Sequence, residues 1–196
     1  SYQLKQKSNK EEMTEMRINA NETAVLVVDY QEKLLPAMSG LEELMDNSKK
    51  LLKGLKELGV PMIVTEQYKK GLGPTVPEIA ECIGDDFKAY EKLTFSGVCT
   101  EEISDAIKAL EKKNILVCGV EAHVCVLQSV IDLKAQGYNV LLVEDCVTSR
   151  KQADKETAVK RAMGEGAFIT SAEAVLFELL YAAGTPTFKV ISKIVK

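Results

Sequence analysis

Cys125 is the residue of this sequence best placed to act as a nucleophile. It follows an apolar run over residues 114–119 and lies at the start of a helical pattern that extends from about residue 124 to 136. A thiol in the first turn of a helix faces free backbone N–H groups, which together with the helix dipole favour the thiolate. The position therefore predicts a nucleophilic thiol with a lowered pKa. Its apolar neighbours also fit a small buried core residue, and position alone leaves both interpretations open.

Two charged residues change this balance. Asp29 ends the apolar run over residues 23–28, where a carboxylate loses its hydration and requires a partner. Lys92 follows a weaker strand pattern over residues 87–91. Taken singly, Asp29 fits a capping carboxylate and Lys92 a solvated surface side chain. With a thiol they predict cysteine chemistry, because the carboxylate can take the thiol proton and the ammonium lowers the pKa of both neighbours.

Strand patterns and helix patterns alternate along the chain, and their order positions these three residues. The repeated strand–helix–strand order predicts an α/β protein with one open, mostly parallel sheet and helices on both faces. Ligands of such sheets bind beyond the carboxyl ends of the strands, where Asp29, Lys92 and Cys125 all fall. The expected strands cover residues 23–28, 61–65, 87–91, 114–119, 138–143 and 167–170, and the expected helices cover 41–58, 100–110, 124–136, 152–165 and 171–182.

Three of these helices have candidate residues for their N-terminal caps. Ser39 and Glu42 have the spacing of a capping box ahead of the helix at residue 41. Thr100 and Ser171 precede the helices that follow them and are residue types that accept hydrogen bonds from the first turn. Residues 71–74, with two glycines and a proline, predict a loop.

Length, charge and cysteine content limit the class of protein. The chain has 196 residues and a net charge of −4, which suits one domain over residues 21–196 after a loose polar tail over residues 1–20. The mildly acidic charge makes nucleic acid an unlikely main partner, and no apolar run approaches the ~20 residues of a membrane helix. The five cysteines form no C-x-x-C pair, which predicts free thiols in a reducing cytoplasm.

The segment Gly-Val-Glu-Ala-His-Val-Cys-Val around Cys125 carries a specific family resemblance. With AVLVVDYQEKLLPAM, VTEQYKKGLGPTVPEI and EKLTFS, it resembles the isochorismatase-like cysteine hydrolase superfamily from about residue 20 to the end of the chain. Within that superfamily, the chain is most similar to isochorismatase domain-containing hydrolases of undefined substrate. The resemblance implies a three-layer αβα fold with a six-stranded parallel sheet in the order 3-2-1-4-5-6. It also implies a homo-oligomer, either a dimer or a larger assembly.

The resemblance also implies an active site. The family triad maps to Asp29, Lys92 and Cys125, and a cis peptide bond is expected between Val120 and Glu121. The backbone N–H groups of Glu121 and Cys125 would then form an oxyanion hole. The implied reaction is hydrolysis of an amide or related C–N bond in a small molecule through a thioester.

The substrate pocket and a metal site are less well defined by the sequence. We expect Tyr68, Leu72, Phe95 and His123 to line the pocket, although a lone histidine such as His123 fits a hydrogen-bonded structural role better than a substrate contact. Family nicotinamidases carry an Asp-x-His element near the second strand, where this chain has Glu66-Gln67-Tyr68. We therefore expect no metal and no cofactor, and Glu66 as a pocket wall or a partner for Lys92. With arginine only at positions 17, 150 and 161, no clamp for a chorismate-derived acid is evident.

Two other classes of function stay open. The chain could be a binding or scaffold member of the family with a vestigial site, since the metal ligands and a substrate clamp are missing. It could also be a redox enzyme that pairs Cys125 with Cys99 or Cys146, although neither lies close to Cys125 in the sequence.

Overall fold

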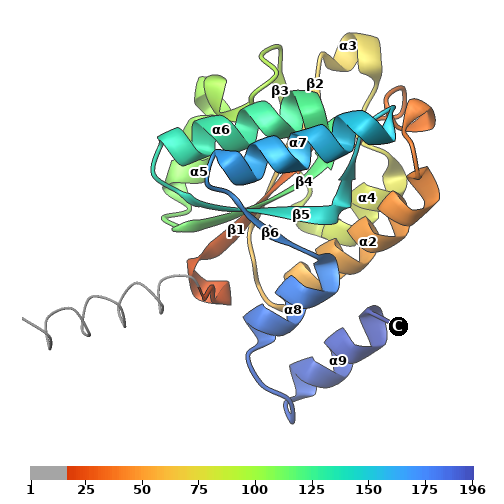
Figure 1. Ribbon diagram of the computed structural model, residues 1–196. Coiled ribbons are helices and arrows are strands. Elements are labelled where there is room, and N and C mark those ends of the chain that lie inside the picture. Colours follow the sequence, from red (N-terminus) through yellow and green to blue (C-terminus); the bar gives the residue numbers. More distant parts are fainter. Residues whose placement is uncertain (1–16) are drawn as a thin grey trace, which may run out of the picture.

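Six strands form a single sheet in which all neighbouring strands run parallel. The computed structural model describes residues 17–196 (Figure 1). The strand order β3-β2-β1-β4-β5-β6 confirms the expected topology. Because the order reverses between β1 and β4, the carboxyl ends of these two strands flank the crevice where ligands bind. The strands are β1 Thr23–Val28, β2 Met62–Gln67, β3 Ala89–Lys92, β4 Asn114–Val120, β5 Asn139–Thr148 and β6 Phe168–Thr170.

Helices cover both faces of the sheet and give the expected three-layer αβα architecture (Figure 1). One core cluster packs α2, α4, α8 and α9 against the sheet, and a second packs α5, α6 and α7 against the opposite face. The helices are α2 Leu41–Glu57, α3 Lys69–Leu72, α4 Pro77–Ile83, α5 Glu101–Ala109, α6 Leu127–Ala135, α7 Gln152–Gly164, α8 Ala172–Leu180 and α9 Pro186–Ile194.

The two central strands explain why their sequences are continuous apolar runs. Every residue of β1 and of β4 is buried, because helices cover both faces of these strands. Full burial of a Val or Leu side chain contributes about 1.5–3 kcal/mol each. The charged residues that follow these strands, Asp29 and Glu121, are therefore attached to fully buried strands.

Gly119 allows β1 and β4 to approach each other at their carboxyl ends. Its φ is +124°, and a Cβ atom at this position would lie 2.0 Å from the backbone oxygen of Val28. Gly119 on β4 pairs with Val28 on β1. Asp29 follows Val28, and Val120 follows Gly119. Only glycine fits this contact, so residue 119 sets the spacing between the two strand ends.

The helix starts differ in part from the expected caps. Ser171 accepts a hydrogen bond from the N–H of Ala174, as expected. The predicted capping box at Ser39 is wrong, since α2 is preceded by Gly40 in a left-handed conformation without a side-chain cap. Thr100 occupies the cap position of α5, but its hydroxyl bonds to that of Thr94 instead of the first turn.

Several elements are longer or more numerous than expected. Strand β5 continues to Thr148, after an irregularity in its pairing with β4. The loop expected over residues 71–74 begins within the short helix α3. The sequence patterns did not predict α4 or α9, and the helix after β4 begins with a π-helical turn over Ala122–Val126.

The first described residues belong to the packed part of the chain. Of the expected tail over residues 1–20, residues 1–16 lie outside the described part. Ile18 is 4% exposed, and its N–H donates to Glu178 on α8. The packed region thus begins before residue 21.

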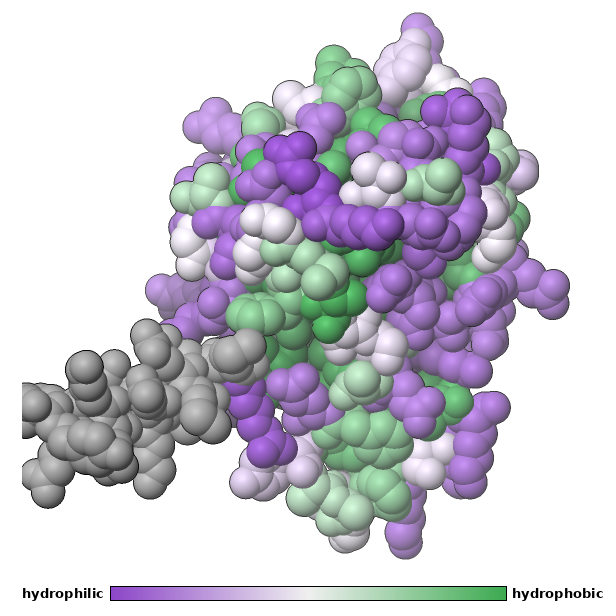
Figure 2. All heavy atoms as spheres, viewed as in Figure 1, coloured by the Kyte–Doolittle hydropathy of each residue, from purple (hydrophilic) through white to green (hydrophobic). Residues whose placement is uncertain are grey.

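The surface combines charged faces with apolar patches. Figure 2 shows apolar side chains between α7 and α8 and along α8 and α9.

Within residues 17–196, no helix is both long enough and apolar enough to cross a bilayer.

Candidate active site

Asp29 lies at the carboxyl end of β1 and is completely buried. Its φ of +54° is in the left-handed region, which aspartate tolerates better than most residues. Oδ1 accepts a hydrogen bond from the hydroxyl of Thr65 at 2.7 Å, and the Asp29 N–H donates to the Thr65 carbonyl at 3.2 Å. Strand β2 therefore fixes both the backbone and the carboxylate of Asp29.

Lys92 ends β3 and extends its ammonium to the same carboxylate. Nζ lies 2.9 Å from Asp29 Oδ2, and neither side chain has any exposed surface. Taken singly, its sequence position fitted a solvated lysine, and burial excludes that interpretation. Charges that leave water must be paired and hydrogen-bonded, and this pair is both.

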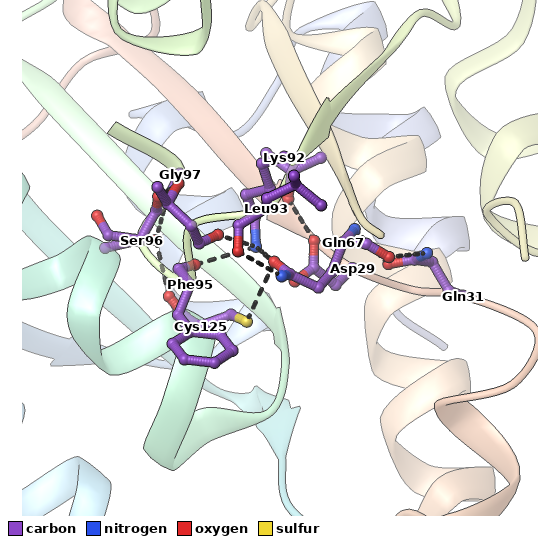
Figure 3. A network of polar contacts seen from close by, with 12 residues as sticks. Asp29, Gln31, Gln67, Lys92, Leu93, Phe95, Ser96, Gly97 and Cys125 are labelled. Carbon is purple, nitrogen blue, oxygen red and sulfur yellow. Dashed lines mark hydrogen bonds and ion pairs between the residues drawn. The ribbon is translucent and has the colours of Figure 1, made fainter. Parts of the chain in front are cut away.

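The remaining bonds of the Lys92 ammonium go to neutral oxygens (Figure 3). Nζ donates to Gln67 Oε1 at 2.6 Å and to the Phe95 carbonyl at 3.0 Å, with the Thr94 carbonyl at 3.4 Å. The segment after β3 therefore turns its carbonyl groups inward toward the ammonium. The Phe95 residue itself is 52% exposed.

Cys125 lies in the π-helical turn after β4 and is 6% exposed. Its thiol faces Gln67 Oε1 across 4.0 Å, and Figure 3 shows it beside the Asp29–Lys92 pair. Burial, and next the Asp29 carboxylate, raise the pKa of the thiol to about 12, while the Lys92 ammonium lowers it. The predicted lowering of this pKa is therefore wrong, because burial and Asp29 together outweigh the effect of Lys92.

The segment between β4 and Cys125 is held from two sides. The peptide bond between Val120 and Glu121 is cis, and the Glu121 carbonyl accepts hydrogen bonds from the N–H groups of Val124 and Val126. The Glu121 carboxylate accepts from the backbone N–H and the Nε of Arg150, at 3.1 and 3.0 Å. The loop after β5 thus anchors the residue that bears one of the two expected oxyanion donors.

Besides Phe95, the other three expected pocket residues lie at different depths. Tyr68 follows β2 and is 50% exposed, and its ring packs against Gly71. Leu72 ends α3 and is partly buried. His123 is partly buried, with Nδ1 2.8 Å from the Ser149 hydroxyl and Nε2 3.9 Å from an Asp154 oxygen. These contacts match the structural role that the sequence left open for His123.

Glu66 does not contact Lys92, so one of its two expected roles is wrong. Its carboxylate pairs with Lys69 at 2.9 Å and accepts from the N–H and the hydroxyl of Thr75 at 2.8 and 2.9 Å. Burial acts to raise its pKa, but these hydrogen bonds and Lys69 outweigh it and hold the pKa below its ordinary value. Side chains alternate along β2, so the neighbouring Gln67 reaches Lys92 instead.

Sequence reasoning singled out the end of β2 but missed the roles of three residues there. Gln67 bonds to Lys92, Thr65 bonds to Asp29, and Gln31 holds the backbone of Gln67. All three are buried polar residues. Thr65 and Gln67 lie toward the carboxyl end of β2, and Gln31 follows β1. These positions were the available signal, since polar residues buried there require partners.

The other cysteines do not complete a redox pair with Cys125. All five are free thiols. Cys146 belongs to the core cluster on the α2 face, whereas Cys125 belongs to the cluster on the α6 face. Cys99 is exposed and donates to Asp132 at 3.2 Å, which raises its pKa. The redox interpretation is therefore not supported.

A cavity lies over the ends of β5 and β6, away from Asp29, Lys92 and Cys125. It has a volume of about 410 Å³, and its lining includes Glu43, Glu144, Asp145 and Lys155 but none of those three residues. No group of three or more His, Cys, Asp or Glu within residues 17–196 is arranged to hold a metal ion. The buried ion pair of Asp29 and Lys92 beside Cys125 is thus separate from this cavity.

Comparisons with known proteins place the chain in a family. The isochorismatase domain matches residues 23–174, so the chain belongs to the isochorismatase family. Over 180 residues it is 36% identical to isochorismatase domain-containing protein 2 of Xenopus laevis, which covers 91% of this chain and 86% of the relative. This membership supports a hydrolase, with its substrate unspecified.

Two solved structures agree with this assignment. The structure described as MAR1 ribonuclease from Caenorhabditis elegans is 37% identical, has a TM-score of 0.86 and covers 91% of this chain and 92% of that chain. YcaC from Pseudomonas aeruginosa, solved with hexane-2,5-diol and covalent acrylamide, is 26% identical, has a TM-score of 0.85 and covers 91% of each chain.

Proposed function

We propose that this protein is a cysteine-dependent hydrolase that cleaves an amide or related C–N bond in a small molecule. The observation that carries the proposal is the buried Asp29–Lys92 ion pair beside the Cys125 thiol. Apolar residues of similar volume usually stabilise a core as well as a buried ion pair does. Stability alone therefore gives no reason for this pair, whereas a proton acceptor beside a nucleophile does.

The first half of the reaction forms a thioester. Asp29 takes the thiol proton as the Cys125 sulfur bonds to the substrate carbonyl carbon. The N–H groups of Glu121 and Cys125 hold the oxyanion, and one such donor is typically worth about 3 kcal/mol in the transition state. The C–N bond then breaks, and Asp29 returns the proton to the leaving nitrogen.

The second half releases the acid. A water molecule gives a proton to Asp29 and bonds to the thioester carbon, and the C–S bond then breaks. The proton returns to the sulfur, so the enzyme regains its starting state. Lys92 balances the charge of Asp29 throughout, which avoids an unpaired carboxylate in the buried site.

The raised pKa of Cys125 determines the order of these events. Because the pKa is about 12, the resting enzyme at neutral pH holds a thiol and not a thiolate. Proton transfer to Asp29 must then accompany attack on the substrate. Asp29 thus acts as a general base in the attacking step, not as a group that ionises the thiol beforehand.

The surroundings of Cys125 suit a small substrate. The thiol is 6% exposed, and Tyr68 and Phe95 are exposed side chains that follow β2 and β3. We propose that Tyr68, Leu72, Phe95 and His123 contact the substrate beside the nearly buried Cys125. The proposal includes no metal and no cofactor.

The test is hydrolysis by the wild type and by Cys125→Ala across a panel of small amides. Released ammonia or amine is measured, and mass spectrometry of the Cys125 peptide detects the acyl-enzyme. The proposal expects turnover of at least one amide, an acyl mass on Cys125, and loss of both in the variant. Turnover by Cys125→Ala at the wild-type rate would refute it. An RNA oligonucleotide in the same panel tests the activity in the name of the nematode relative.

A scaffold protein with a vestigial site is the second candidate. The raised thiol pKa favours it, because a binding protein has no need for a reactive sulfur. The two candidates differ in the acyl-enzyme, which a scaffold does not form with any amide. Absence of turnover and of an adduct over the whole panel would support the scaffold.

The location and assembly of the protein are also proposals. We propose a cytoplasmic homo-oligomer, a dimer or larger, that acts on a small molecule and not on nucleic acid or a membrane. The free thiols of the described residues suit a reducing compartment. Light scattering after size exclusion tests the assembly, and fractionation of cells that express the full chain tests the location.

A further inference from the structure

Gln67 has a fixed orientation at the centre of the site. It ends β2, is 9% exposed, and binds at both ends of its carboxamide. Oε1 accepts from Lys92 Nζ at 2.6 Å, and Nε2 donates to the Leu93 carbonyl at 2.9 Å. Because an ammonium only donates and a carbonyl only accepts, these two partners determine which end is oxygen. The carboxamide therefore turns an acceptor, and not a donor, toward the Cys125 sulfur.

The backbone of Gln67 is fixed by a second buried glutamine. Gln31 Oε1 accepts from the Gln67 N–H at 2.6 Å, and Gln31 Nε2 donates to the Gln67 carbonyl at 2.9 Å and the Gly73 carbonyl at 2.7 Å. Figure 3 shows Gln31 on the side of Gln67 away from Cys125. Gln31 thus supports the same strand end without bonding to the triad.

The position of Gln67 controls the direction of the ammonium donors. The Lys92 ammonium has three N–H groups, and Asp29, Gln67 and Phe95 accept from it at 2.9, 2.6 and 3.0 Å. Oxygen atoms therefore engage every donor of the ammonium. Without Gln67, one N–H would lose its shortest contact, and the Thr94 carbonyl, 3.4 Å from Nζ, and the Cys125 sulfur, which faces Gln67 Oε1, would compete for it.

We infer that Gln67 is a positioning residue that holds the Lys92 ammonium on Asp29 and keeps the Cys125 proton on sulfur until substrate binds. The role rests on the proposed function, because it regulates the same nucleophile. Deprotonation within the substrate complex then confines the reactive thiolate to the time of catalysis. In this way Gln67 protects the thiol from other electrophiles.

The test measures the alkylation rate of Cys125 by iodoacetamide from pH 7 to 10, resolved by peptide mass spectrometry. Gln67→Met has a similar length but no acceptor, so it releases one Lys92 N–H to the sulfur. We expect alkylation at pH 8 to become about tenfold faster, as a fall of one pKa unit gives tenfold more thiolate. Gln67→Glu keeps an oxygen on Lys92, whether or not its other oxygen is protonated. It should react no faster than the wild type.

Gln31→Met is the matched control for loosening of the site. It removes the same residue type from the segment after β1 that bonds to the backbone of Gln67, and we expect lower thermal stability with an unchanged pH profile of Cys125. The exposed Cys99 serves as an internal standard for reagent concentration in every variant. If Gln67→Met does not fold, Gln67→Leu, which also lacks the acceptor, takes its place with the same expected tenfold increase.

Two results would overturn the inference. Equal rates in Gln67→Met and wild type would show that Gln67 does not restrain the thiol. Faster alkylation in Gln67→Glu and Gln31→Met alike would show that loosening alone exposes it. Both results come from alkylation rates, which do not require turnover. Failure of the proposed function would instead appear as full hydrolytic activity of Cys125→Ala, so the two failures can be told apart.

Discussion

Asp29 and Tyr30 are consecutive residues after β1, and each belongs to a buried group of polar side chains. The two groups lie on opposite faces of the sheet. Asp29 joins Lys92 and Cys125 on the α6 face, and its partners include a full positive charge. Tyr30 lies in the core on the α2 face, where its hydroxyl is 2.6 Å from the Ser48 hydroxyl and donates to the Cys146 carbonyl at 3.0 Å. Only the first group holds an ion pair.

Each group also has a buried thiol, and the two thiols have the same raised pKa. Burial raises the pKa of Cys118 to about 12, with the Tyr30 hydroxyl lowering it, and burial and Asp29 raise that of Cys125 to the same value. A thiol pKa therefore does not distinguish the candidate nucleophile from a core cysteine. The distinguishing feature is a proton acceptor with its own counter-ion beside Cys125. Variants of the two groups test this difference.

Replacement of the two thiols should give the largest contrast. Cys125→Ser should lower turnover of any accepted amide about 10⁴-fold, because the hydroxyl is a much weaker nucleophile, with little change in melting temperature. Cys118→Ala should keep the wild-type turnover and lower the unfolding free energy by about 1 kcal/mol through lost packing. Steady-state kinetics and urea unfolding measure both. Equal loss of turnover in the two variants would contradict the assignment of Cys125 as the nucleophile.

Removal of the counter-ion should have the next largest effect. Lys92→Met leaves the Asp29 carboxylate buried without a charged partner, and we expect the unfolding free energy at pH 7 to fall by about 3–5 kcal/mol. The double variant Asp29→Asn with Lys92→Met should recover part of this loss, because it removes both charges. Urea unfolding of the single and double variants gives the coupling energy. Additive losses would show that the pair is not coupled.

The sequence predicted the fold well because its signals are local. Continuous apolar runs such as residues 23–28 and 114–119 follow from burial on both faces, and both runs form strands. Short elements and caps were predicted less well, as at Ser39, where Gly40 precedes α2. There the path of the chain depends on distant contacts, such as that of the Ser39 N–H with the Ser149 carbonyl.

The sequence indicated which residues the structure brings together, but not their electrostatics. The residue types and the strand ends indicated Asp29, Lys92 and Cys125, and the structure brings all three together. The pKa of Cys125 could not be inferred in this way, because it depends on how deeply the thiol is buried and on the distance to Asp29. Gln67 was missed because glutamine is common on surfaces, and only its burial shows its role.

The raised pKa values predict a loss of stability in alkaline solution. The pKa values of Cys118 and Cys125 are higher in the folded than in the unfolded protein. Each thiol therefore contributes its full stabilisation of the fold below about pH 8.5, and this contribution is lost as the pH rises toward 12. We expect the unfolding free energy to fall above about pH 9, with each group adding at most about 1.4 kcal/mol per pH unit. Urea unfolding at successive pH values should show a shallower slope for Cys125→Ala and for Cys118→Ala. A slope unchanged in both variants would contradict the raised values.

A smaller effect than that of Lys92→Met is expected for the polar group on the α2 face. Tyr30→Phe removes the hydroxyl that bonds to Ser48 and to the Cys146 carbonyl, and it leaves both buried without this partner. We expect the unfolding free energy to fall by about 1–3 kcal/mol. Turnover and the pH profile of Cys125 alkylation should stay at wild-type values, because residue 30 turns away from the ion pair. A shift in that profile would show that the two polar groups are coupled through the end of β1, which would contradict their independence.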